Sequence, residues 1–80
     1  MKILAIRPAA GPKDVAFFDV ELSPQLRMFN LILRRGQHGG LRTYARKAAG
    51  KHAASFHPDL AEQITRAATA ALRGGSHVDR

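Results

Sequence analysis

The feature that most constrains the fold is a period-two alternation of apolar residues, broken once by a short turn. Every second residue from Ala16 to Leu22 is apolar, while acidic residues lie on the opposite face. This pattern is typical of a half-buried β-strand. Residues 23–25, Ser-Pro-Gln, predict a turn, because proline presets φ for the first corner position. The apolar segment 26–33 follows at once and predicts the returning strand of a hairpin.

Further extended segments flank this hairpin. Glycine and proline punctuate the chain between them, and the glycine-bearing loop after the hairpin suits a turn with positive φ angles. In chain order, we expect a strand at residues 1–8, a loop at 9–13, a turn at 36–40, a strand at 41–46, a loop around Gly50 at 47–52, and a short strand at 53–56.

The strongest helical signal begins at residue 58. Pro58 suits the first helical position, where the missing N–H costs nothing, His57 stands just before it, and Asp59 complements the helix dipole. Gly74-Gly75 is expected to end the helix, and residues 76–80 to form a mobile tail. Small and apolar residues recur on one narrow stripe: Leu60, Ile64, Ala67, Ala68 and Ala71.

Strands followed by one helix predict an α+β fold. We expect one domain over residues 1–75, with an antiparallel sheet of four to five strands and one C-terminal helix on one face. A chain of 80 residues without cysteine has a small core and no disulfide, and oligomerisation is a common reinforcement in such cases. Residues 26–33 are apolar on both faces: alternation places Phe29, Leu31 and Leu33 on one face and Leu26, Met28 and Ile32, with Asn30, on the other. One face can pack against the helix and the other against a second subunit, so we expect a homodimer with Met28, Phe29 and Ile32 at its interface.

The chain is strongly basic, with thirteen Lys and Arg against six Asp and Glu and a formal net charge of +7. No acidic residue stands between Glu21 and Asp59, a stretch that holds seven of the cations. Such one-sided charge favours an anionic partner: nucleic acid, an acidic protein or an anionic membrane surface.

Phosphate contact is the functional interpretation of these cations, and a solvated rim that keeps the domain soluble is the alternative. An aromatic side chain among them can stack on an unpaired base or simply cover sheet surface. The predicted nucleic-acid-binding residues are Arg34, Arg35, Arg42, Tyr44, Arg46, Lys47 and Lys51.

Other functional classes find no support in the sequence. There is no nucleophile elbow and no glycine-rich phosphate loop before a helix, so we expect no enzyme activity and no cofactor. His52 and His57 would lie on opposite faces of an extended chain, which argues against a metal site. No segment approaches the ~18 apolar residues of a membrane span, and the N-terminal apolar run is too short for a signal peptide. A cytoplasmic location is the expectation.

The order and spacing of several motifs resemble the stage V sporulation protein G family, the bacterial septation regulators, over roughly residues 3–73. The matching positions are Ile6-Arg7, the strand at residues 16–22, Asn30-Leu31 with Leu33, Gly40-Leu41, Arg46-Lys47, His57-Pro58 and Ile64. The resemblance implies a small homodimer with a mainly antiparallel sheet, a C-terminal helix and a basic DNA-contacting loop, here Arg46, Lys47 and Lys51. The chain departs from the family in lacking the usual proline near the start of that loop, in the loop's shorter length and in its alanine-rich helix.

The leading hypothesis is therefore a cytoplasmic, homodimeric nucleic-acid-binding regulatory protein. The alternative is an interaction adaptor whose charge docks an acidic protein, without nucleic acid; a phage or mobile-element component fits the same features. The sequence leaves open the choice between DNA and RNA, the target sequence and the regulated process.

Overall fold

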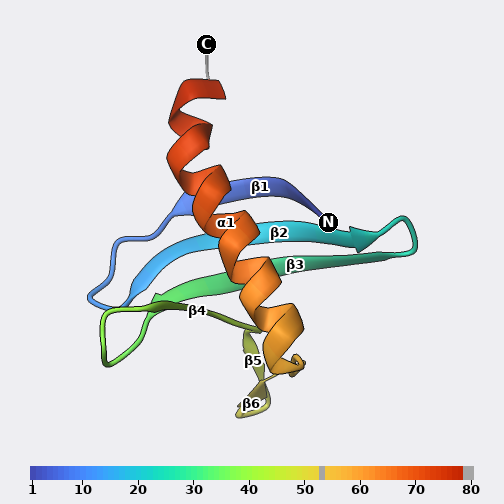
Figure 1. Cartoon of the computed structure of the whole chain (residues 1–80). Coiled ribbons are helices and arrows are strands. Elements are labelled where there is room, and N and C mark those ends of the chain that lie inside the picture. Colours follow the sequence, from blue (N-terminus) through green and yellow to red (C-terminus); the bar gives the residue numbers. More distant parts are fainter. Residues whose placement is uncertain (53, 79–80) are drawn as a thin grey trace.

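The structure is a computed structural model that describes residues 1–52 and 54–78, and it confirms the α+β fold. A four-stranded antiparallel sheet in the order β1-β2-β3-β4 carries one long helix across one face (Figure 1). The elements are β1 (Lys2–Pro8), β2 (Asp14–Ser23), β3 (Leu26–Arg35), β4 (Leu41–Tyr44), the small β5 (Lys47–Ala48) and β6 (Lys51–His52), and α1 (Pro58–Val78).

The predicted β2–β3 hairpin forms the centre of the sheet and of the core. Ala16 pairs with Leu33 and Phe18 with Leu31, so these four side chains share the face that lies under the helix. All four are almost completely buried, as is Val20 one step further along β2. The period-two alternation of β2 therefore predicted the buried row of that strand correctly.

The predicted alternation of β3 is wrong in its first half, because the strand contains a bulge. Phe18 pairs with Leu31 and Val20 pairs with Met28. Between these two pairs β2 advances by two residues and β3 by three, so β3 contains one extra residue. Asn30 lies in this stretch with a φ of 58°, a left-handed conformation that asparagine tolerates well. An extra residue in a strand moves the side chains of the residues that precede it to the opposite face of the sheet.

The bulge changes the predicted dimer interface. Met28 pairs with buried Val20 and packs against the core under the helix. Ile32 pairs with Phe17 on the opposite, helix-free face, which we call the open face. Met28 and Ile32 therefore do not share one surface, contrary to the prediction, whereas the Phe29 side chain is 62% exposed.

Helix α1 begins beside β4 and crosses the sheet to β1 (Figure 1). Ile64 and Ala68 are fully buried against the sheet, as the small-residue stripe predicted. The Thr43 and Thr65 hydroxyl oxygens lie 2.8 Å apart and join β4 to the helix. Since the Thr65 hydroxyl donates to the Ala61 carbonyl, the Thr43 hydroxyl is the donor between the two. The buried Thr43 side chain is thus satisfied.

The two ends of the helix differ in how well the sequence predicted them. At the start, the His57 carbonyl accepts the Ala61 N–H at 2.9 Å and the His57 Nδ1 accepts the Asp59 N–H at 3.2 Å, so His57 caps the helix. At the other end the predicted stop at Gly74-Gly75 is wrong, because α1 continues to Val78. Glycine lowers helix stability by about 1 kcal/mol relative to alanine but does not forbid helical angles. Residues 79–80 of the predicted tail lie outside the described residues.

The segment between β4 and the helix also differs from the prediction. β4 ends at Tyr44, two residues early, and the expected loop at 47–52 is instead the β5–β6 hairpin. Ala49 and Gly50 have φ angles of 54° and 81° at its turn, as two-residue hairpin turns of type I′ require. Residues 54–56 form no strand, and residue 53 of that expected strand lies outside the described residues.

Candidate nucleic-acid interface

Ion pairs divide the cations of this chain into two groups. Four of the five acidic side chains in the described residues lie near an arginine, so these four arginines are largely neutralised. The pairs are Asp14–Arg34 at 2.7 Å, Asp19–Arg7 at 3.7 Å, Glu21–Arg27 at 3.0 Å and Glu62–Arg66 at 3.0 Å. The fifth, Asp59, lies 3.9 Å from the His57 Nδ1, but that nitrogen accepts the Asp59 N–H and serves the helix cap rather than an ion pair. The excess positive charge must therefore come from the remaining lysines and arginines.

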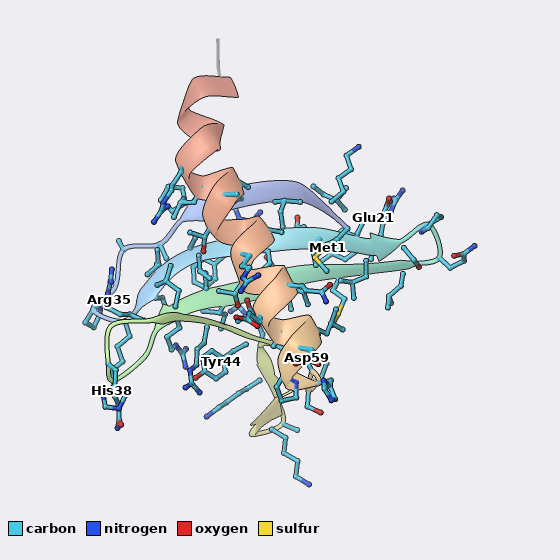
Figure 2. All side chains as sticks on the ribbon, in the orientation of Figure 1. Met1, Glu21, Arg35, His38, Tyr44 and Asp59 are labelled. Carbon is cyan, nitrogen blue, oxygen red and sulfur yellow. The ribbon has the colours of Figure 1, made fainter. Side chains whose placement is uncertain are left out.

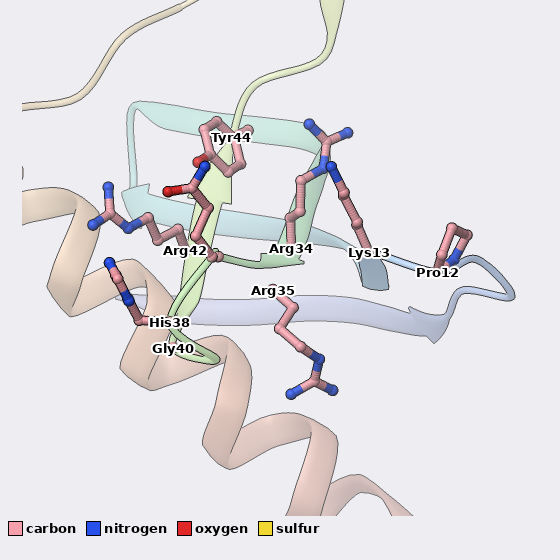
Figure 3. Close-up of a pocket in the computed structure, with 10 residues that line it drawn as sticks. Pro12, Lys13, Arg34, Arg35, His38, Gly40, Arg42 and Tyr44 are labelled. Carbon is pink, nitrogen blue, oxygen red and sulfur yellow. The ribbon is translucent and has the colours of Figure 1, made fainter.

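A half-open cavity of about 610 Å³ collects several of these remaining cations. It lies at the end of the sheet where the β1–β2 and β3–β4 loops meet, the end at which Figure 2 labels Arg35 and His38, and we call it the end cavity (Figure 3). Among the described residues that line it, none is acidic. Its charged and aromatic lining consists of Lys13, Arg34, Arg35, His38, Arg42 and Tyr44.

Backbone hydrogen bonds fix the two loops that form the end cavity. The Arg35 N–H donates to the Lys13 carbonyl at 2.8 Å, which joins the β1–β2 loop to the end of β3. Within the β3–β4 turn, the Gly36 N–H donates to the Gly40 carbonyl at 2.7 Å. A Cβ on Gly36 would lie 3.3 Å from that same oxygen, and Gly39 has a φ of 85°. The positive φ therefore favours glycine at Gly39, and a side chain at Gly36 would crowd the Gly40 carbonyl.

Strand geometry distributes the cations around the end cavity. Arg34 pairs with Arg42 across β3 and β4, so both lie on the open face, whereas Arg35 is the next residue and points to the other face. Figure 3 shows Lys13 extending beside Arg34 and Arg35 pointing in the opposite direction. The end cavity thus has cations on both faces at this end of the sheet.

Arg34 is held by two partners and differs from the other cations. Its Nε donates to the Asp14 Oδ1 at 2.7 Å, and its Cζ lies 5.3 Å from the centre of the Tyr44 ring. The carboxylate compensates the guanidinium charge, and the ring contact is of the cation–π type. Arg34 is therefore less suited to phosphate contact than the sequence alone predicted.

The structure brings together four of the seven predicted binding residues and separates the other three. Arg34, Arg35, Arg42 and Tyr44 all line the end cavity. The other three form a second group, which we call the hairpin group. Arg46 lies with its Cζ 5.6 Å from the Phe17 ring, and Lys47 and Lys51 stand on the β5–β6 hairpin.

Sequence reasoning missed Lys13 and His38 as members of the end cavity. Lys13 follows Gly-Pro in a loop and precedes an acidic residue, so the sequence offers no local charge cluster there. One signal was available: the hairpin register places Asp14 opposite Arg34, and Lys13 is the next residue. Counting back from the turn at residues 23–25, with residue 22 opposite residue 26, gives the same pairing, because the bulges of the two strands offset each other. That count does not show that the β1–β2 loop joins the end of β3, a contact made by the Lys13 carbonyl and the Arg35 N–H.

The centre of the open face is a neutral polar network. The Arg7 Nη2 donates to the Asn30 Oδ1 at 2.7 Å, and the Asn30 N–H donates to the Asp19 Oδ1 at 2.8 Å. Arg7 also lies 3.7 Å from the Asp19 carboxylate. The positive charge of the open face is consequently concentrated toward β4 and the end cavity.

Neither a metal-binding cluster nor a membrane-spanning helix occurs in the described residues. No group of three or more His, Cys, Asp or Glu side chains lies close enough to hold a metal ion there. No helix in this part of the chain is long and apolar enough to cross a membrane.

Comparison with known proteins adds no relative to these observations. No family model matches the chain, no curated protein matches it, and no solved structure matches it.

Proposed function

We propose that this protein is a small nucleic-acid-binding regulatory protein that holds phosphates through the end cavity and the hairpin group. One observation carries the proposal. Lys13, Arg35 and Arg42 gather around one concave site, while four of the five described acidic side chains pair with other arginines. Clustered cations bind a polyanion by releasing its condensed counterions, which favours nucleic acid as the partner.

The resemblance to the stage V sporulation protein G family supports the same proposal from a different part of the chain. The basic loop of that family corresponds to Arg46, Lys47 and Lys51. These residues stand on or beside the β5–β6 hairpin, apart from the end cavity. We propose that the protein works as a cytoplasmic homodimer, in which two copies of each basic group contact one nucleic acid.

The test is a binding titration at several salt concentrations, read by fluorescence anisotropy on a labelled 20-base-pair DNA duplex and on its single strand. The variant Arg35→Ala/Arg42→Ala should bind at least ten-fold more weakly than the parent at low salt. It should also flatten the slope of log affinity against log salt by about 1.5 to 2, because two phosphate contacts are lost. Loss of affinity on both probes is expected, because the duplex and the single strand both present backbone phosphates.

The matched control is Lys2→Ala/Arg66→Ala, which removes two positive charges far from the end cavity. Lys2 begins β1 at the opposite end of the sheet, and Arg66 lies on the exposed face of the helix. An equal loss for both double variants would reduce the effect to net charge and remove the site assignment. If the parent protein is retained on heparin but binds neither probe at low salt, an acidic protein is the partner instead.

The hairpin group is tested separately with Arg46→Ala/Lys47→Ala/Lys51→Ala. We expect weaker binding on all sequences and a flatter salt slope, with the end cavity intact. Unchanged affinity for this triple variant would restrict the proposed interface to the end cavity.

A further inference from the structure

The end cavity has the size of a site for one small ligand and is half open to solvent. Its volume of about 610 Å³ lies within the roughly 300–1,000 Å³ of small-molecule and cofactor sites. A DNA duplex is convex and keeps its bases stacked inside, so only its backbone would touch the rim of such a concavity. A single unpaired nucleotide can enter it.

One wall of the end cavity offers a stacking surface. Asp14 holds the Arg34 guanidinium at 2.7 Å, and that guanidinium lies over the Tyr44 ring at 5.3 Å. Aromatic rings and arginine guanidinium planes are the surfaces on which proteins stack unpaired bases. Because Asp14 compensates its charge, Arg34 suits the face of a neutral base better than a phosphate. This explains why one arginine of the cavity is paired with an acid while its neighbours are not.

The other cations of the end cavity stand on either side of this wall. Both Lys13 and Arg42 line the cavity, and Figure 3 shows Lys13 extending beside Arg34 and Arg42 extending from β4 on the other side of Tyr44. A nucleotide within a strand carries a phosphate on each side of its base. Cations that flank a stacking surface therefore match a nucleotide better than they match an isolated anion.

From this geometry we propose that the end cavity binds one unpaired nucleotide, with the base stacked on the Arg34 guanidinium, which Tyr44 supports from its other side, and the flanking phosphates at Lys13 and Arg42. The protein then prefers single-stranded nucleic acid to duplex. This inference rests on the proposed function and specifies the form of nucleic acid that the same site takes.

Three probes of equal length separate base stacking from phosphate attraction: a 12-nucleotide oligothymidine, its duplex with oligodeoxyadenosine, and a 12-unit abasic strand. We expect the oligothymidine to bind at least about five-fold more tightly than each of the other two, the lower end of what one stacked base contributes. The comparison with duplex is stringent. A duplex has the higher charge density, so a purely electrostatic surface would prefer it.

Variants of Tyr44 test whether this side chain is responsible for the extra affinity for oligothymidine. Tyr44→Leu should bind the abasic strand like the parent but lose the extra affinity for oligothymidine, whereas Tyr44→Phe should keep it. Arg42→Ala should weaken binding to both single strands, and Lys2→Ala is the control for one lost charge. The ratio of oligothymidine to abasic affinity in the parent protein tests the inference even if Tyr44→Leu fails to fold.

Two results would overturn the inference: equal or tighter binding of the duplex, or an unchanged oligothymidine-to-abasic ratio in a folded Tyr44→Leu. Either result is compatible with the proposed function, because phosphate contacts alone are sufficient for nucleic-acid binding. The absence of binding to all three probes at low salt would instead remove the proposed function itself.

Discussion

Asn30 adopts a φ of 58° within β3 and makes two contacts there. Its N–H donates to Asp19, and its side-chain oxygen accepts from Arg7. The left-handed conformation adds a residue to β3 relative to β2, so Met28 lies under the helix and Phe29 stays exposed. One backbone angle therefore sets the facing of the first half of a ten-residue strand.

Substitution of Asn30 tests this role. Asn30→Gly removes the side-chain contact with Arg7 but allows positive φ, whereas Asn30→Ala removes the contact and disfavours the angle. Because a left-handed angle costs a non-glycine residue about 1–2 kcal/mol, we expect Asn30→Ala to lower the free energy of unfolding by that much more than Asn30→Gly. Urea denaturation measures both. Equal stability of the two variants would mean that the bulge does not depend on this angle.

At the scale of elements, α1 is longer than the sheet is wide. Its 21 residues extend about 31 Å at 1.5 Å per residue, whereas four strands about 4.8 Å apart span less than 20 Å. Figure 1 shows the last turns of the helix beyond β1. The core contacts of Ile64 and Ala68 come from the middle of the helix, and little of the sheet lies under its end.

Gly74→Ala tests whether the helix continues through the predicted stop. A Cβ on Gly74 would meet nothing within 4 Å, and alanine favours a helix interior over glycine by about 1 kcal/mol. We expect the variant to raise the free energy of unfolding by about 0.5–1 kcal/mol. Gly39→Ala is the opposite control, because its φ of 85° should make that variant less stable. If Gly74→Ala destabilises the protein, the helix ends at this glycine in a left-handed conformation.

For the whole molecule, charge and apolar surface are placed at opposite ends of the sheet. The end cavity gathers cations beside the β1–β2 and β3–β4 loops, whereas Phe29 and Leu26, 62% and 49% exposed, lie in the first half of β3 near the β2–β3 turn. Exposed apolar side chains on a small domain favour association with another surface. An interface there would leave both end cavities of a homodimer open to nucleic acid.

The proposed homodimer predicts a solution mass of two chains at micromolar concentration, measured by light scattering. Phe29→Glu should reduce it to one chain, because a charge would be buried at the interface without a partner. Gln37→Glu adds the same charge in the exposed β3–β4 turn at the other end of the sheet, so it serves as the matched surface control and should keep the dimer. A one-chain mass for the parent protein would exclude the dimer, and an unchanged mass for Phe29→Glu would move the interface elsewhere.

Local pattern in the sequence was sufficient to predict much of this fold. Alternation gave β2 and its buried row, proline and glycine gave the turns, and Pro58 with its following stripe gave the start and buried face of α1. These features depend on residues close together in the chain, so composition and spacing report them directly. The sequence also predicted four residues of the end cavity, because they lie on the two strands of one tight hairpin.

The tertiary structure alone decided the rest, since it depends on contacts between distant segments. The Asn30 bulge reversed the facing of Met28, and the pairing of β2 with β3 brought Asp14 to Arg34 and Lys13 into the end cavity. Neither can be predicted from periodicity, because periodicity assumes a strand without bulges and contains no information about the neighbouring strand. The amino-acid order thus determined which residues are cationic and extended, and the register of the folded sheet determined which of them surround one site.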